Sequence, residues 1–292
     1  MDESYTSRFS GIGRVFGTSA LQQLHNARVM VIGLGGVGSW TVEALARSGI
    51  GALTLVDFDD VCVSNTNRQI LALDSTRGKF KAEVLRDRVK DINPKCEVEA
   101  MVQFFTPKTA DQVFARNEHV IVDAIDDVHN KALLICEAVR RGRKIVTTGG
   151  IGGKRWLSSV VVTEFAKSGS DSLLSAVRKR LRKHHGFTLD AKYDGATAVS
   201  LVGPTFYSRM DGTVATHGDP RDRGRINCNN GFGALAYIAG TLGFAAAMVA
   251  VEEIFGEFSF TDGRPVRRSE APGPIGNSPT TVVPLRVDTI PK

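Results

Sequence analysis

Four closely spaced glycines follow the first apolar segment of this 292-residue chain, in the sequence Gly33-Leu-Gly35-Gly36-Val-Gly38-Ser39. Glycine permits a tight turn and a close approach of the backbone to a ligand, and the first N–H groups of a helix that opens there point at an anion. Asp57 ends the next apolar run, where a carboxylate can accept hydrogen bonds from ribose hydroxyls. Strand, glycines, helix and acid in this order predict a nucleotide site.

Charged and amide side chains that could act on nucleotide phosphates come later in the chain. They are Asp59, Asn65, Arg68, Gln69, Lys81 and Asp126. A dinucleotide dehydrogenase binds only a pyrophosphate bridge, and it would leave Asn65, Arg68 and Lys81 without a role. Cations that converge on a phosphate chain, with a carboxylate opposite that can carry Mg²⁺, fit a triphosphate undergoing attack. The pattern therefore favours ATP with Mg²⁺ over NAD.

Alternating strand and helix patterns are expected to position these residues. The strands are expected at 28–32, 53–56, 97–102, 119–124 and 144–148, and the helices at 18–26, from the glycines to 47, at 78–91, 109–116 and 128–140. This order predicts an α/β fold, a Rossmann-like and mostly parallel sheet flanked by helices. Ligands of such sheets gather at the carboxyl ends of the strands, which is where the candidate residues lie.

The chain is expected to divide into three parts. Residues 1–170 form the nucleotide-binding core, 171–256 a C-terminal α+β elaboration, and 257–292 an extended tail rich in proline. Within the elaboration, 171–186 reads as a helix with five basic residues, Arg178, Lys179, Arg180, Arg182 and Lys183. Two interpretations of this helix stay open, a solvated face and a surface that contacts RNA phosphates.

Composition limits the class of protein. The net charge of +6 gives a weak indication of a polyanionic partner. The four cysteines are too far apart for a Cys-x-x-Cys pair, so we expect no zinc site, no disulfide framework and a cytoplasmic protein. The acidic start of the chain does not resemble a secretory signal. The segment 232–251 is almost free of charge and long enough to cross a membrane, but its many small residues favour a buried helix and no stable membrane insertion.

The motifs resemble those of the E1-like (ThiF and MoeB) ATP-dependent adenylating enzymes, which include the ubiquitin-activating and molybdopterin-synthase-activating proteins. The matching residues are Gly33 to Ser39, Asp57-x-Asp59, Asn65-x-x-Arg68-Gln69, Lys81 and Asp126. Within this family, stretches 36–47, 59–70, 146–153 and 228–234 are similar to those of the tRNA threonylcarbamoyladenosine dehydratases. The resemblance covers about residues 6–183 and 209–255.

The resemblance implies a reaction in which ATP activates a carboxylate as an acyl-adenylate. In the dehydratases this carboxylate belongs to threonylcarbamoyladenosine in tRNA, and an internal nucleophile then displaces AMP and closes a ring. Asp57 would hold the ATP ribose, Asn65, Arg68 and Lys81 the phosphates, and Asp126 the Mg²⁺. Chemistry that consists of positioning and charge neutralisation suits such a set of side chains.

The resemblance also implies residues outside the glycine turn. Arg14 matches the position at which this family sends an arginine into the neighbouring protomer's site, which implies a homodimer, with Arg8 as the reserve candidate. Cys228 precedes the apolar helix and is the candidate nucleophile, because a cysteine takes the acyl group in the ubiquitin-activating branch. Ring closure within the substrate would not need it. A cysteine desulfurase and sulfur-acceptor system is a further partner that stays open.

Two departures from the family pattern affect the assignment. Asp127 stands where an asparagine is common, which leaves the metal ligand open between Asp126 and Asp127. The stretch 196–204 lacks the cysteine and glutamate usual in the dehydratases. The main alternative is adenylation of the C-terminal carboxylate of a ubiquitin-like or sulfur-carrier protein, although such activators often carry a zinc site and no basic helix. A non-catalytic RNA-binding module would not need the ATP site.

Overall fold

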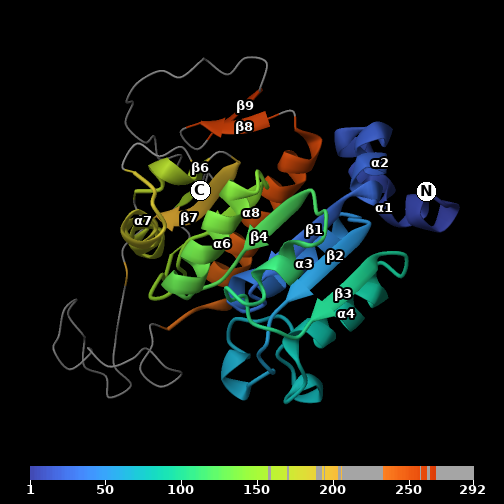
Figure 1. Cartoon of the computed structure of the whole chain (residues 1–292). Helices are drawn as coiled ribbons and strands as arrows, with labels where there is room; N and C mark the ends of the chain where they lie inside the picture. The colour runs from blue at the N-terminus through green and yellow to red at the C-terminus, as the bar shows by residue number, and fades with distance from the viewer. Residues whose placement is uncertain are drawn as a thin grey trace, which may run out of the picture.

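A seven-stranded sheet forms the centre of the computed structural model, which describes residues 1–156, 159–169, 171–188, 193, 195–202, 205, 233–256, 258–261 and 264–267. Its strands are β1 (Arg28–Ile32), β2 (Ala52–Val56), β3 (Glu97–Met101), β4 (Val120–Asp123), β5 (Ile145–Thr148), β6 (Ser159–Glu164) and β7 (Ala196–Val202). The order across the sheet is β3-β2-β1-β4-β5-β7-β6 (Figure 1). Only the β6–β7 pair in this sheet is antiparallel, so the predicted mostly parallel sheet is confirmed. A separate antiparallel pair joins β8 (Phe258–Thr261) and β9 (Arg264–Arg267).

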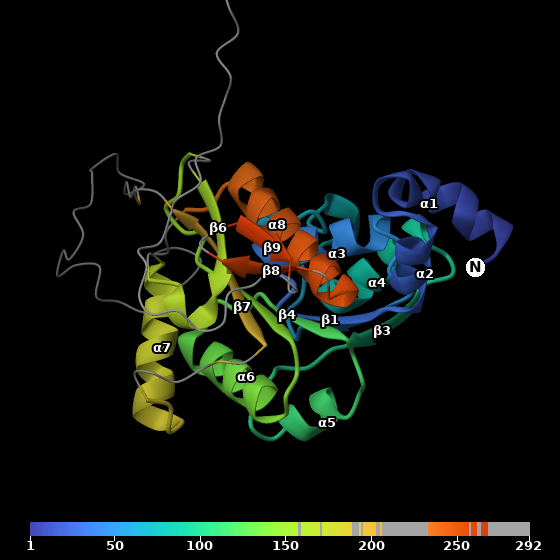
Figure 2. The same ribbon diagram turned by 90° about the horizontal axis from the view of Figure 1, so that it is seen from above.

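Helices cover both faces of the sheet. They are α1 (Glu3–Phe16), α2 (Thr18–Asn26), α3 (Gly36–Arg47), α4 (Lys81–Ile92), α5 (Ala110–Phe114), α6 (Val128–Arg140), α7 (Ser172–His184) and α8 (Ala236–Phe255). Figure 2 shows α3, α4 and α8 on one face, with α1 and α2 at the same side, and α5, α6 and α7 on the other. Side chains of β1 alternate between the two layers, with Val29 and Val31 in the core under α3 and α8 and Met30 and Ile32 in the core over α6.

Several local features differ from the sequence expectation. Helix α1 and the strands β6, β7, β8 and β9 are not among the expected elements, and α4 begins at Lys81 rather than near Gly78. Gly78 has a positive φ of 77°, and Phe80 at the N-cap of α4 is extended, so the chain turns before the helix begins. The consequence for the site is that Lys81 occupies the first turn of α4, beside the carboxyl end of β2.

Helix α8 packs tightly against α3. A Cβ on Gly243 would lie 2.7 Å from both the Trp40 Cβ and the Val37 carbonyl oxygen, so only glycine allows this approach. The Thr41 hydroxyl donates to the Gly243 carbonyl at 3.1 Å. By length and a mean hydropathy of 1.6, α8 could cross a membrane, but 56% of its most apolar window is buried inside the protein. That burial is typical of a core helix.

Candidate active site

The glycine turn at the carboxyl end of β1 is close-packed and tolerates little besides glycine at two positions. Gly33 has a positive φ of 86°, and a Cβ there would lie 2.8 Å from the Ala124 backbone. A Cβ on Gly38 would lie 1.8 Å from the Gly33 carbonyl oxygen. Helix α3 therefore begins directly against the strand, and the first N–H groups of the helix lie at the carboxyl edge of the sheet. Ser39 is fully buried and packs inside the turn.

Asp57 links this turn to the end of β2. Its Oδ2 accepts a hydrogen bond of 2.6 Å from the Leu34 N–H, and its Oδ1 accepts one of 2.8 Å from the Asp59 N–H. Burial raises the pKa of Asp57, while the nearby charge of Lys81 and the two N–H donors oppose that rise. Each carboxylate oxygen has two acceptor sites, so both retain capacity for a ribose hydroxyl.

Lys81 and Asp59 form an ion pair beside Asp57. The Lys81 Nζ lies 2.8 Å from Asp59 Oδ2, and the lysine side chain is only 6% exposed whereas that of Asp59 is 56% exposed. The backbone repeats the link, because the Lys81 N–H donates to the Asp59 carbonyl at 3.0 Å. The structure thus brings a buried ammonium group to the end of β2, with an accessible carboxylate neutralising it.

The segment with Asn65, Arg68 and Gln69 lies against the glycine turn. The positions of a Cβ on Gly36 and Gly35 are 3.6 Å from Arg68 Cγ and 3.8 Å from Gln69 Nε2. Within the described residues, the Arg68 guanidinium donates to two acceptors of its own segment, the Ser64 carbonyl at 2.8 Å and the Asn67 side chain at 3.0 Å. Within the described residues, the buried Oε1 of Gln69 has no hydrogen-bond partner. A cradle with free donors and an unpaired buried amide fits a bound polar ligand.

Asn65 holds the segment in shape. Its side chain is 7% exposed, and its Oδ1 accepts a hydrogen bond of 3.1 Å from the Cys62 N–H. The Asn65 carbonyl accepts from the N–H groups of Arg68 and Gln69. The Trp40 indole N–H donates to the Arg68 carbonyl at 3.0 Å, which ties the segment to α3.

The two acids after β4 have different surroundings. Asp127 is the N-cap of α6, and its Oδ1 accepts from the Asn130 N–H at 2.8 Å. Asp126 is exposed, and no hydrogen bond or ion pair of its carboxylate occurs within the described residues. The capping role of Asp127 makes Asp126 the better candidate for a metal ligand.

A buried ion pair that the sequence reasoning missed supports the turn before Asp126. The Lys131 Nζ lies 3.0 Å from Asp123 Oδ2 and donates at 2.9 Å to the Ile125 carbonyl, and both charged side chains are fully buried. Thr147 donates to the same oxygen of Asp123 at 2.7 Å. Burial raises the pKa of Asp123, and Lys131 opposes that rise. The feature of the sequence that could have predicted this buried pair is the position of Lys131 on the apolar face of α6.

Two phenylalanines lie beside Asp57 and also escaped notice. Phe58 follows β2, Phe104 follows β3, and their rings stack with centroids 4.6 Å apart. Both remain about half exposed, at 47% and 54%. Their position at the carboxyl edge of the sheet would offer apolar surface to a planar group held near Asp57.

Arg14 does not join this cluster. It lies exposed in the last turn of α1, and the neighbouring Phe16 packs on Phe255 at the C-terminal end of α8 with ring centroids 5.2 Å apart. The reserve candidate Arg8 donates to the Ile92 carbonyl at 3.2 Å, which engages it locally. Cys228 lies outside the described residues.

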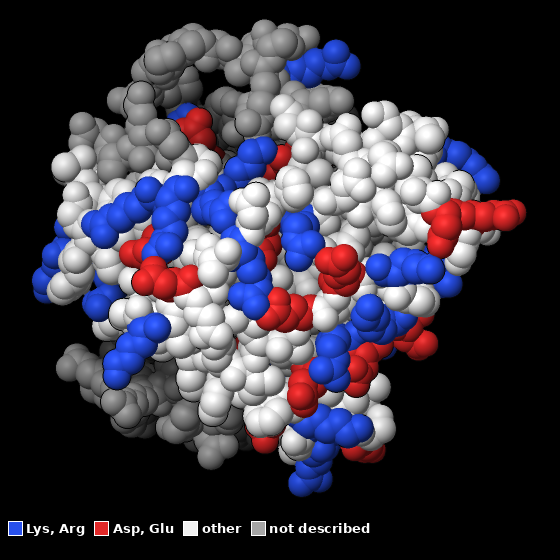
Figure 3. Space-filling model, turned by 45° about the vertical axis from the view of Figure 1, so that its right-hand side comes forward, with Lys and Arg blue, Asp and Glu red and all other residues white. Residues whose placement is uncertain are grey.

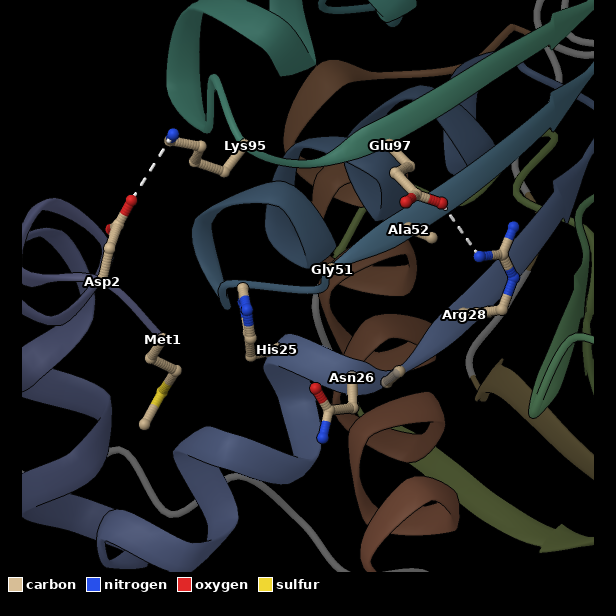
Figure 4. A pocket seen from close by; sticks show the side chains of 10 residues that line it. Met1, Asp2, His25, Asn26, Arg28, Gly51, Ala52, Lys95 and Glu97 are labelled. Carbon is tan, nitrogen blue, oxygen red and sulfur yellow. Dashed lines mark hydrogen bonds and ion pairs between the residues drawn. The ribbon is translucent and has the colours of Figure 1, made fainter.

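A cavity of about 490 Å³ lies at the opposite edge of the sheet, at the amino ends of β1 and β2. Figure 4 shows its charged lining paired across short gaps, Asp2 with Lys95 and Arg28 with Glu97. Ligands of parallel α/β sheets bind at the carboxyl ends instead. This cavity therefore does not compete with the glycine turn as the candidate site. Within the described ranges, no three His, Cys, Asp or Glu residues cluster as metal ligands.

Residues 10–255 match the sequence model of the ThiF family. The chain belongs to the ThiF family. Among its relatives, the tRNA threonylcarbamoyladenosine dehydratase of Escherichia coli is 41% identical over 261 residues, which cover 87% of this chain and 96% of the relative. The solved structure of that E. coli protein, TcdA, in complex with ATP superposes with a TM-score of 0.75 at 38% identity, over 87% of this chain and 96% of the other. The adenylyltransferase and sulfurtransferase MOCS3 of Drosophila sechellia is 34% identical over 132 residues, only 45% of this chain and 29% of that protein.

Membership of the ThiF family confirms the resemblance inferred from the motifs. It also confirms the Rossmann-like fold and the class of adenylating enzymes. Two alternative functions, a dinucleotide dehydrogenase and a non-catalytic RNA-binding module, are thereby excluded. The match to the E. coli dehydratase covers 87% of this chain, whereas the match to MOCS3 covers 45% of it. The comparison therefore does not favour activation of a carrier protein.

Proposed function

We propose that this protein is an ATP-dependent tRNA threonylcarbamoyladenosine dehydratase. The observation that carries the proposal is the match to E. coli TcdA over nearly the whole of both chains, a protein whose structure holds ATP. The glycine turn, Asp57, Arg68 and Lys81 are the residues of this chain that fit the same nucleotide. The packed Gly33 and Gly38 and the unpaired buried Oε1 of Gln69 support that fit.

Each group of the site has a proposed role in positioning or charge neutralisation. Asp57 accepts from the ribose, while the first turn of α3, Asn65, Arg68 and Lys81 neutralise the phosphates, and Asp126 holds Mg²⁺. An oxygen of the substrate carboxylate bonds to the α-phosphorus and pyrophosphate leaves. An internal nucleophile of the same side chain then displaces AMP, and the ring closes with net loss of water. Cys228 is not required for this sequence of steps and stays a candidate nucleophile only for a thioester route.

The decisive assay measures pyrophosphate release from ATP with and without tRNA that carries threonylcarbamoyladenosine. We expect release to depend on this tRNA, and the product nucleoside to show loss of one water by mass spectrometry. A purified ubiquitin-like or sulfur-carrier protein is the control substrate. Release driven by the carrier protein and not by tRNA would overturn the proposal in favour of the alternative.

We further propose that the enzyme works as a homodimer in which Arg14 acts on the partner's site. Ala239, near the N-terminal end of α8, approaches Gly36 of the glycine turn, whereas Phe255 at the other end packs beside Phe16. The distance along α8 from Ala239 to Phe255 is about 24 Å at 1.5 Å per residue, too far for Arg14 to reach its own site.

An exposed apolar stripe on α8 supports the same arrangement. Phe244 and Met248 are about half exposed, and Val15 and Phe16 at the end of α1 are exposed as well. When two copies pack these stripes about a two-fold axis perpendicular to α8, their α8 helices run antiparallel. That packing brings Arg14 of one protomer to the N-terminal end of α8 in the other, where the glycine turn lies.

A mixing experiment tests Arg14. Arg14→Ala and Lys81→Ala proteins should each be nearly inactive, and an equal mixture should regain activity because roughly a quarter of all sites become complete after random exchange of subunits. Exchange is verified by mass spectrometry of the mixed dimers. Arg8→Ala is the control, since Arg8 engages Ile92 and its loss should leave the protein active on its own. No recovery in a mixture shown to contain mixed dimers would contradict the role in trans.

Helix α7 is a proposed surface for tRNA, and it has fewer available cations than the sequence suggests. The Arg178 guanidinium donates to the Ser168 carbonyl at 2.7 Å and lies over the Phe165 ring, and burial lowers its pKa. Lys179 and Lys183 are exposed, one helical turn apart. On the face shown in Figure 3, Lys and Arg are interspersed with Asp and Glu, so no single basic surface stands out there.

Reversing the charge of two α7 lysines tests whether they contact tRNA phosphates or only contribute to the net charge of the protein. Lys179→Glu with Lys183→Glu should weaken tRNA binding and lower the slope of log Kd against log salt by roughly 1.5, since each phosphate contact contributes ~0.7–0.9. The matched control carries Lys90→Glu and Lys108→Glu, exposed lysines outside α7 with the same change in charge. Equal slopes for the two double variants would return α7 to a merely solvated face. ATP affinity should be the same in both.

The substrate and the packing of α8 also indicate a cellular compartment. We propose a cytoplasmic enzyme, because tRNA is its substrate and α8 is packed on the sheet.

The need for Mg²⁺ is tested by measuring pyrophosphate release at increasing Mg²⁺ concentrations in the wild type and in Asp126→Asn. We expect Asp126→Asn to need more Mg²⁺ for half-maximal release and Asp127→Asn, which keeps a capping side chain, to resemble the wild type.

A further inference from the structure

An exposed tryptophan stands in the loop between β5 and β6, within the sequence Lys154-Arg155-Trp156. Its side chain is 56% exposed, and the Arg155 guanidinium lies 5.6 Å from the Trp156 ring centroid. The segment 149–156 contains no acidic residue. An exposed indole with a guanidinium beside it can bind a partner through stacking and charge.

Several hydrogen bonds hold the backbone of this loop. The Tyr237 hydroxyl at the start of α8 donates to the Arg155 carbonyl at 2.9 Å, and the Gly153 N–H donates to the Gly233 carbonyl at 2.7 Å. Lys154 also forms an isolated β-bridge with Thr205. A fixed backbone lowers the entropy lost when the indole binds a ligand.

The loop adjoins the candidate active site. Ile151 Cδ1 lies 3.1 Å from the position of a Cβ on Gly36, in the glycine turn. From Ile151 to Trp156 an extended chain spans at most about 18 Å. A second contact connects the two regions. The Asn67 side chain, next to Arg68, donates at 2.8 Å to the carbonyl of Ala234, and Ala234 follows Gly233, which holds the loop. The tryptophan is therefore near enough to meet a substrate whose reacting group lies at the turn.

We propose that Trp156 stacks on an unpaired base of the tRNA that neighbours the modified adenosine, with Lys154 and Arg155 contacting the adjoining phosphates. The proposal rests on the proposed function, which brings a tRNA nucleotide to the glycine turn. Proteins that bind unpaired bases use aromatic rings for stacking and arginine or lysine for the backbone. The proposal adds a substrate-binding residue in the loop that adjoins the glycine turn through Ile151.

Kinetics with tRNA as the varied substrate test this role. Trp156→Ala should raise the KM for tRNA about tenfold, in the range that loss of one base–aromatic stack produces. The KM for ATP and kcat at saturating tRNA should stay within about twofold, because the proposed stack is on a neighbouring base and not on the reacting groups. Trp156→Phe, which keeps a stacking ring, should recover most of the affinity. A uniform loss in both variants would indicate a structural role and overturn the proposal.

Fluorescence gives a second readout, since the chain contains only two tryptophans, Trp40 and Trp156. Titration with tRNA that carries threonylcarbamoyladenosine should quench the fluorescence of the wild type and leave that of Trp156→Phe nearly unchanged, while ATP alone should not produce this difference. Wild-type tRNA-dependent turnover with an unchanged KM in Trp156→Ala would overturn this inference alone. Absence of tRNA-dependent turnover in the wild type would remove the proposed function and this inference together. A Trp156→Ala protein that loses dimerisation instead of tRNA affinity would place the ring in an interface between copies.

Discussion

Lys81→Ala should lower the rate of tRNA-dependent pyrophosphate release at least about tenfold, which corresponds to ~1.4 kcal/mol of transition-state stabilisation. The ammonium group is 6% exposed and is held at the end of β2 by Asp59 at 2.8 Å. A charge fixed in a site of low exposure acts on a phosphate chain without first having to reorganise. The same loss is expected for Arg68→Ala, because within the part of the chain that the structure describes its guanidinium donates to Ser64 and Asn67 of its own segment.

The fold should survive both substitutions. Asp59 is 56% exposed, so water can solvate its carboxylate when the buried Lys81 ammonium is absent, and no uncompensated buried charge remains. Arg77→Ala is the matched control, because Arg77 is an exposed cation of the same connection between β2 and α4. Thermal unfolding shows that the variants are folded, and pyrophosphate release compares their rates. Near wild-type release from Lys81→Ala and Arg68→Ala together would exclude these residues as phosphate ligands.

The regular core of the fold could be predicted because its signals are local. β1 and α6 have the predicted bounds, since the apolar periodicity changes abruptly at Arg28, Ile32 and Val128. Helix α1 could not be predicted, because Gly11 and Gly13 lower its helix propensity. Its stability comes from tertiary contacts instead, with the Tyr5 hydroxyl donating to the distant Gly49 carbonyl at 2.5 Å.

The candidate site was predictable where residue type and strand order sufficed, as for Asp57 and Lys81. Other parts depend on partners far apart in the sequence. Phe58 and Phe104 meet only because β2 pairs with β3. Arg178 counts as a surface cation in the sequence, yet a bond to Ser168 engages it in the structure. Pairings of this kind carry no periodicity, so composition and spacing alone do not reveal them.

Gly38→Ala should destabilise the protein by about 3 kcal/mol or more, the upper range for an overpacked site. Helix propensity alone predicts the opposite sign, because alanine inside a helix is favoured over glycine by ~1 kcal/mol. The steric contact of the new Cβ decides whether overpacking or helix propensity determines the change in stability. The new Cβ would lie 1.8 Å from the Gly33 carbonyl oxygen, a backbone atom that cannot move without opening the turn between β1 and α3.

Gly35→Ala is the matched control, since it places the same methyl group in the same turn. Its φ is −75°, and the new Cβ would meet only Gln69 Nε2, at an ordinary distance of 3.8 Å. We therefore expect the free energy of unfolding in urea to change by less than about 1 kcal/mol, even where ATP affinity falls because the backbone no longer approaches the phosphates as closely. If Gly38→Ala does not accumulate as folded protein while Gly35→Ala does, the steric explanation holds. If Gly38→Ala instead unfolds at the same or a higher urea concentration than the wild type, propensity has outweighed packing, and the turn is not the rigid phosphate cradle on which the ATP site depends.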